Sequence, residues 1–283
     1  MVIMELKIPE KYKDLYVVGD IHGEFKELVY VLTQRYQIKD AVVIVAGDCG
    51  FGFEKPSHYL GLYEGKLEKR LKNSNIMILC VRGNHDDPEY YNGELRPDWE
   101  YLKCLPDYSS VWWGSREILV VGGAVSVDQD WRIQENAIQK RLGSSKRVWW
   151  PSEIPLELGD LGIQKLPGHV FMVVSHDSPI SMMPVLARDS VNIKTGDLFE
   201  SVLESREYLE KILWRCKPDR WYYGHHHTSW AGTNGGTLWR ALGIMEVVQV
   251  PLGDECQTGV EASSTEGETK STELVDEEKE TKE

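Results

Sequence analysis

The fold is decided by LYVVGDIHG at residues 15–23. Its first four residues form a short apolar run that ends at a glycine, which is typical of a buried β-strand followed by a turn. After the turn, apolar side chains recur with the spacing of an amphipathic helix, at Phe25, Leu28, Val29 and Leu32. The stretch therefore predicts a strand, a loop and a helix, and the loop carries an aspartate and a histidine.

Four other predicted strands also run into loops with polar side chains. The strands and the motifs after them are 41–46 before Gly47-Asp48, 76–81 before Gly83-Asn84-His85-Asp86, 170–174 before His176, and 220–223 before Gly224-His225-His226-His227. Further strands are predicted at 118–121 and 245–250, helices at 60–71 and 199–214, and loops with short helices over 128–155. Strands alternating with helical segments indicate an α/β domain with layers of sheet and helix.

Seven side chains with oxygen or imidazole donors share this position directly after a strand. They are Asp20, His22, Asp48, Asn84, His176, His225 and His227. The carboxyl ends of parallel strands meet at one edge of a sheet, so these side chains are expected to lie together. Carboxylates mixed with imidazoles favour Mn, Fe or Zn over Ca. Seven donors exceed what one ion needs, and two metals about 3.5–4 Å apart that share a carboxylate form a centre for phosphate-ester hydrolysis.

In this order, the five motifs resemble those of the calcineurin-like metallophosphoesterases, from Asp20 to His227. The resemblance implies a β sandwich of two sheets flanked by helices, with the metals at the sheet edges. It also implies a role for each matching residue. Asp20, His22 and His227 are expected to hold the first metal, Asn84, His176 and His225 the second, Asp48 to bridge them, and His85 to act as the general acid.

The expected reaction is hydrolysis of a phosphate mono- or diester, on a small molecule or a nucleotide. The attacking group implied by the resemblance is hydroxide bridging two divalent metals, since metal ions lower the pKa of bound water toward neutrality. Manganese is the expected metal, with iron or zinc as alternatives. His85 suits protonation of the leaving group because the ordinary pKa of histidine lies near the working pH.

The second motif departs from that of the related protein Ser/Thr phosphatases. In those enzymes it continues with an aspartate and an arginine, whereas here Gly47-Asp48 continues as Cys49-Gly50. This departure argues against a phosphoprotein substrate. Arg82 and Arg132 are the candidate phosphate contacts, and the alternative for each is an ordinary loop arginine.

Two other features of the sequence leave alternatives open. His226 stands between two expected ligands, but alternation along an extended chain predicts that it points the other way. The tryptophan pairs at 112–113 and 149–150 could stack on a nucleobase, although packing within the protein is the favoured interpretation.

Charge and composition limit the partners and the compartment. The net charge is −13, and residues 254–283 contain 11 acidic and 3 basic residues, which leaves −5 for residues 1–253. We expect a metallophosphoesterase domain at 1–253 and a disordered acidic tail at 254–283 that could recruit a protein partner. An acidic chain disfavours nucleic acid as a partner. No apolar run is long enough to span a membrane, and five cysteines without a CxxC pair favour the reducing cytoplasm.

Two other classes of protein remain as alternatives to a small-molecule phosphoesterase. A non-catalytic scaffold of the same fold is disfavoured because all seven ligands and the expected acid are present. A metal-dependent nuclease would need a basic channel or patch. Steep salt dependence of DNA binding would favour the nuclease.

Overall fold

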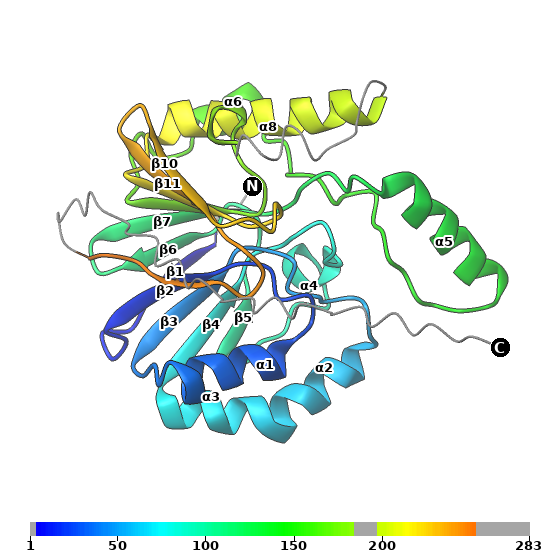
Figure 1. Ribbon diagram of the computed structural model, residues 1–283, viewed down its shortest axis with the longest axis horizontal. Helices are drawn as coiled ribbons and strands as arrows, with labels where there is room; N and C mark the ends of the chain where they lie inside the picture. The colour runs from blue at the N-terminus through cyan, green and yellow to red at the C-terminus, as the bar shows by residue number, and fades with distance from the viewer. Residues whose placement is uncertain (1–3, 184–196, 253–283) are drawn as a thin grey trace, which may run out of the picture. The chain divides into compact units, whose positions relative to one another are not determined.

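The computed structural model describes residues 4–183 and 197–252. Within this part, two β-sheets lie between two layers of helix, as Figure 1 shows. The described residues up to Val250 form one compact unit. The predicted tail, 254–283, lies outside the described residues. The layered α/β architecture expected from the sequence, a two-sheet sandwich flanked by helices, is confirmed.

The first sheet has five strands in the spatial order β12-β2-β3-β4-β5. Their bounds are β2 Asp14–Val18, β3 Ala41–Val45, β4 Ile76–Cys80, β5 Leu102–Cys104 and β12 Val247–Gln249. Strands β2 to β5 are parallel, and β12 pairs antiparallel with β2. Val18, Val45 and Cys80 are paired across β2, β3 and β4, so the loops after these three strands start level with one another.

The second sheet has seven strands in the spatial order β1-β6-β7-β8-β9-β11-β10. Their bounds are β1 Glu5–Lys7, β6 Ser110–Trp113, β7 Arg116–Val121, β8 Met172–Ser175, β9 Arg220–Tyr223, β10 Trp230–Asn234 and β11 Thr237–Ala241. Strands β7, β8, β9 and β11 are parallel. Here too, therefore, the loops after neighbouring strands lie at one edge.

Most helices of the described part lie on the outer sides of the two sheets. Their bounds are α1 Phe25–Tyr30 with the π-turn Val31–Arg35, α2 Pro56–Leu62 with the π-turn Tyr63–Leu67, α3 Glu68–Ser74, α4 Glu89–Asn92, α5 Gln129–Arg141, α6 Gly159–Gln164, a 3₁₀ turn Ile180–Met182, and α8 Asp197–Cys216. In Figure 1, α1, α2 and α3 lie on the side of the first sheet, and α6 and α8 on the side of the second.

Burial on both faces explains why the central strands read as continuous apolar runs. In β3, Val43 and Val45 belong to the hydrophobic core that also contains Leu28 and Leu32 of the first helical segment. The alternate residues Val42 and Ile44 are equally inaccessible and face the other way, since side chains alternate along a strand. A strand buried on both faces is apolar at every position.

The structure corrects the expectation of loops and short helices over 128–155. Residues 129–141 form the 13-residue helix α5, which projects from the body in Figure 1. None of its residues is buried, so no apolar stripe marks it in the sequence. Its sequence signals are electrostatic: Asp130 lies in the first turn, and Lys140 and Arg141 lie in the last.

Five strands in the structure were not predicted from the sequence, namely β1, β5, β6, β10 and β11. The first three have only three or four residues. The last two form a hairpin around Gly235-Gly236, both with positive φ, and a Gly-Gly pair is a hairpin signal that the sequence contained.

Two smaller findings concern the cysteines and membranes. Cys49, Cys80, Cys104 and Cys216 are buried free thiols, so no disulfide joins the cysteines of the described part. Burial raises the pKa of Cys49 well above its usual value, which keeps that thiol neutral. Over residues 4–183 and 197–252, no helix is both long enough and apolar enough to cross a bilayer.

Candidate functional site

The candidate site lies where loops from both sheets meet. The strands lead into it as follows: β2 into Asp20 and His22, β3 into Asp48, β4 into Asn84 and His85, β8 into His176, and β9 into His225 and His227. Asp48 Oδ1, from the first sheet, lies 3.2 Å from His176 Nε2, from the second. The expectation that strand ends gather these side chains therefore agrees with the geometry.

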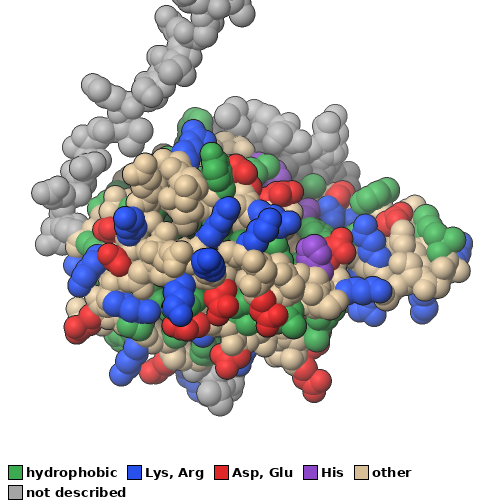
Figure 2. Space-filling view, turned by 90° about the horizontal axis from the view of Figure 1, so that it is seen from below, with side chains coloured by type: hydrophobic (Ala, Val, Ile, Leu, Met, Phe, Trp, Pro, Cys, Tyr) green, Lys and Arg blue, Asp and Glu red, His purple; other side chains and the backbone are tan. Residues whose placement is uncertain are grey.

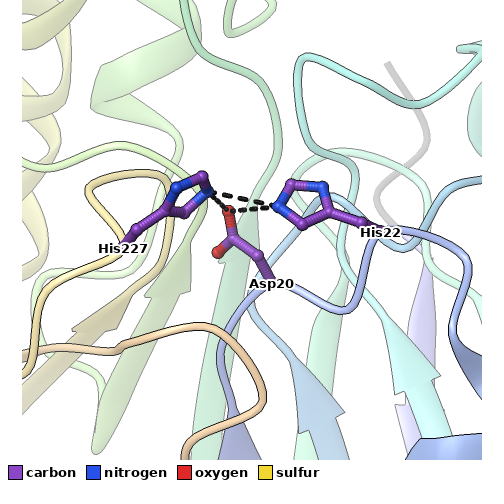
Figure 3. A group of neighbouring side chains, drawn as sticks. All are labelled: Asp20, His22 and His227. Atoms are coloured by element: carbon purple, nitrogen blue, oxygen red, sulfur yellow. Dashed lines mark hydrogen bonds and ion pairs between the residues drawn. The ribbon is translucent and has the colours of Figure 1, made fainter.

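Asp20, His22 and His227 form one group that could hold a metal ion, with one donor atom from each within 4.8 Å of the others. His227 Nε2 lies 3.1 Å from Asp20 Oδ2 and 3.2 Å from His22 Nε2. Figure 3 shows the three side chains converging, Asp20 and His22 from the loop after β2 and His227 from the loop after β9. These are the three residues expected to hold the first metal.

Asp48 occupies the centre of the cluster. Its carboxylate takes part in two further groups that could hold an ion, one with His22 and His85 and the other with Asp20 and His176. His85 donates its backbone N–H to Asp48 Oδ1 at 2.9 Å. A carboxylate shared in this way has the placement that a bridging ligand needs.

His176 connects Asn84 and His225, the other two residues expected to hold the second metal. Asn84 Oδ1 is 2.8 Å from His176 Nε2, and the rings of His176 and His225 are 5.1 Å apart between centroids. Asn84 donates from Nδ2 to Ser126 Oγ, which in turn donates to the buried carboxylate of Glu153. These two hydrogen bonds orient the side-chain amide of Asn84 so that its oxygen faces the site. The sequence analysis did not identify Ser126 or Glu153.

The backbone is strained at four of the seven expected ligands. His22, Asp48, His225 and His227 all have positive φ, between 46° and 63°. Such conformations cost about 1–3 kcal/mol each for residues other than glycine, and they persist where the surroundings enforce them, often at functional sites. Gly83 is required for a different reason: a Cβ there would lie 2.0 Å from Asp48 Oδ1.

The electrostatics of the site are set by burial and by Asp48. Burial disfavours charge on Asp48, but His176 and His85 outweigh it and hold the pKa of this carboxyl far below its usual value. Burial likewise opposes charge on His176, but Asp48 raises the pKa of this imidazole to about 10. Burial lowers the pKa of His225 to about 3. A metal at His176 must displace its proton, because imidazole binds metals only in its neutral form.

The donor set fits divalent cations. Asp20 and Asp48 are both buried, and their ion-pair partners in the described part of the chain are histidines rather than lysines or arginines. Two buried carboxylates this close together need a compensating positive charge. Carboxylate oxygen and imidazole nitrogen together suit Mn, Fe or Zn.

His85, the expected general acid, lies at the open side of the cluster. Its Nδ1 is 3.6 Å from Asp48 Oδ2, its side chain is 20% exposed, and its ring lies 6.3 Å from that of Phe53. Burial lowers the pKa of His85, with Asp48 acting in the opposite direction and Arg132 in the same one. The ring is therefore partly accessible to solvent while it lies beside Asp48.

Asp86 organises the loops that carry Asp48 and Asn84, and the sequence analysis gave it no role. Its buried carboxylate accepts backbone N–H groups from Cys49, Gly50, Phe51 and Gly83. Burial and the neighbouring Asp48 raise its pKa to about 6, against the effect of the hydrogen bonds from Gly83, Cys49 and Phe51. The Asp of Gly-Asn-His-Asp therefore ties two loops of the site together.

The expectation that Arg82 contacts phosphate is not supported by its position. Its side chain is buried and forms an ion pair with Asp107 at 3.0 Å. All five N–H groups are used, because the guanidinium also donates to the carbonyls of Ser152, Glu153 and Ile154. Arg82 therefore fixes the loop that carries Glu153.

Arg132 lies closer to the candidate site. It bonds Asp128 and the carbonyl of Val148, and its charge acts on His85. In Figure 2, histidines reach the surface beside the projecting segment that contains α5, with basic side chains nearby.

The remaining sequence features belong to none of the three groups of the described residues that could hold a metal ion. His226 points away from the cluster, as expected, toward Asp177. Trp113 and Trp150 are buried, which agrees with packing for these two.

Comparison with known proteins identifies the family of this chain. The model of the calcineurin-like phosphoesterase family matches residues 14–229. No curated protein matches the sequence. Among solved structures, the chain is similar to the phosphopantetheinyl hydrolase of Mycobacterium tuberculosis, with 14% identity and a TM-score of 0.43 over 89% of this chain and 100% of that one. It is also similar to a candidate 5′-nucleotidase of Staphylococcus aureus, with 15% identity and a TM-score of 0.36 over 83% of this chain and 49% of that one. These two similarities are too distant to carry an argument about substrate.

Proposed function

Because this chain belongs to the calcineurin-like phosphoesterase family, we propose that it hydrolyses a phosphate mono- or diester of a small molecule or nucleotide, using two divalent cations. The observation that carries the proposal is the placement of two buried carboxylates, Asp20 and Asp48, among histidines from both sheets. A single ion needs fewer donors than this cluster offers. Manganese is the proposed metal.

Different residues of the chain are proposed to hold the two cations and to donate the proton. Asp20, His22 and His227 would hold one cation, Asn84, His176 and His225 the other, and Asp48 would contact both. When bound, the cations would lower the pKa of water between them and neutralise charge on the phosphoryl oxygens. His85 is proposed to hold a proton at its ring and pass it to the departing oxygen.

Metal removal tests the proposal. Protein stripped of metal with a chelator is expected to lose hydrolysis of p-nitrophenyl phosphate and bis(p-nitrophenyl) phosphate, and to regain it on addition of Mn²⁺. The control is stripped protein kept without metal and assayed under the same conditions. Preference for the diester would direct the search toward phosphodiesters, and preference for the monoester toward phosphatases. Turnover that persists after verified metal removal would contradict the proposal.

The two arginines are expected to respond differently to truncation. Arg82→Ala leaves Asp107 buried without its partner and should lower the free energy of unfolding by about 3–5 kcal/mol. Arg132→Ala should fold normally and raise KM about 10–100-fold, because a charged hydrogen bond to phosphate is worth roughly 1.5–3 kcal/mol. Urea unfolding and steady-state kinetics of both variants check this pattern. The reverse pattern would return Arg82 to the substrate site.

The surface gives less support to a nuclease. On the face drawn in Figure 2, basic and acidic side chains are interspersed. Binding to a polyanionic duplex rests on lysines and arginines that neutralise several phosphates. A small phosphate ester therefore remains the proposed substrate class.

A further inference from the structure

His226 separates two expected metal ligands but faces a different part of the molecule. Its Nε2 lies 3.0 Å from Asp177 Oδ1, and its side chain is only 5% exposed. A carboxylate can only accept, so His226 donates this hydrogen bond. The middle histidine of Gly-His-His-His is therefore anchored in the protein interior, while the histidines on either side reach the site.

Asp177 connects this anchor to a second loop of the site. It follows His176 directly in the chain, so one buried carboxylate joins the loop after β8 to the loop after β9. Arg206 of α8 donates from Nε to both oxygens of Asp177, at 3.2 and 3.1 Å. The carboxylate is thus held from the helix layer, independently of any metal.

The backbone on both sides of His226 is in the left-handed region. His225 has φ 63° and His227 has φ 51°. A chain released from its anchor would relax toward ordinary φ values, which would turn both flanking imidazoles out of their present directions. Asp20 contacts the flanking residues themselves, through the N–H of His225 and Nε2 of His227, whereas the bond to Asp177 holds the residue between them.

We propose that His226 is a positioning residue whose hydrogen bond to the Arg206-held Asp177 presets His225 and His227 for metal binding. The inference rests on the metal-binding part of the proposed function and not on its substrate or reaction. Groups that orient metal ligands in this way typically change metal affinity about 10–100-fold when they are removed.

Mn²⁺ binding by the full-length chain, measured by isothermal titration calorimetry on stripped protein, tests the inference. His226→Phe keeps the volume of the ring and removes the donor, so the affinity should fall about 10–100-fold. His226→Gln places an amide N–H near the position of Nε2 and should bind Mn²⁺ within about threefold of the unmodified chain. His226→Asn carries the same amide on a side chain that is too short to reach Asp177, and it should behave like the Phe variant.

Thermal unfolding of each stripped variant separates positioning from simple stabilisation. If His226 is a positioning residue, the Mn²⁺ affinity depends on the hydrogen bond to Asp177. The Gln variant should then keep its affinity, and the Phe and Asn variants should lose it, whether or not their melting temperatures change. Equal affinity in all three variants would overturn the inference, and so would equal loss in all three. If His226→Phe does not fold, the comparison of Gln with Asn still decides. The experiment measures Mn²⁺ binding and not hydrolysis. Failure to hydrolyse phosphate esters would therefore contradict the proposed function but would leave the inference about His226 unchanged.

Discussion

An Asp48→Asn variant is expected to fold and to lose phosphoester turnover by about three orders of magnitude or more. The substitution keeps the size of the side chain and one oxygen, which can still accept the backbone N–H of His85. It removes the negative charge shared by both expected metal positions. Metals supply several kcal/mol of transition-state charge stabilisation, and each 1.36 kcal/mol corresponds to a factor of about ten in rate.

The measurement is kcat/KM at saturating Mn²⁺, with circular dichroism to verify the fold. The matched control is Asp219→Asn, because Asp219 also pairs with a histidine, His169 at 3.0 Å, but both are exposed. The control should keep its full activity. Activity of Asp48→Asn within tenfold of the unmodified chain would contradict the central placement of Asp48.

The sequence could predict that the site residues lie together, because this depends on where the parallel strands end and not on individual side-chain contacts. A strand that is buried on both faces is visible as an apolar run, and in a parallel sheet its carboxyl end fixes where the next loop begins. This was enough to place Asp20, Asp48 and His176 together. The direction of His226 agrees with the prediction, but alternation along an extended chain does not explain it, because His225 and His227 on either side have left-handed backbone.

The supporting contacts could not be predicted, because they depend on where side chains turn after the loops have folded. The sequence offered Arg82 as a candidate phosphate contact, but its guanidinium bonds the buried carboxylate of Asp107, 25 residues further along the chain. Glu153 is connected to Asn84, an expected ligand, through Ser126. Neither contact has a periodic or local sequence signal.

Replacement of His85 is expected to cause the second large loss of activity, and the pattern of that loss distinguishes a general acid from a metal ligand. As a general acid, His85 matters in proportion to how poor the leaving group is, because an acidic phenol departs without protonation and an alcohol does not. His85→Ala should therefore lose about 10²–10⁴ in kcat on an alkyl phosphate ester and much less on a p-nitrophenyl ester. His58→Ala, at an exposed histidine outside the three groups that could hold a metal, should change neither rate.

The competing role is that of a metal ligand, since His85 also groups with His22 and Asp48 in an arrangement that could hold an ion. A ligand contributes before the leaving group departs, so its loss would lower both rates equally and weaken Mn²⁺ binding. The ratio of the two rates therefore decides between the roles, and the Mn²⁺ affinity of His85→Ala provides an independent check. A rate loss confined to the alkyl ester with unchanged affinity would establish proton donation. An equal loss with weakened binding would move His85 into the metal centre and leave the proton donor to be sought among the other residues around Asp48.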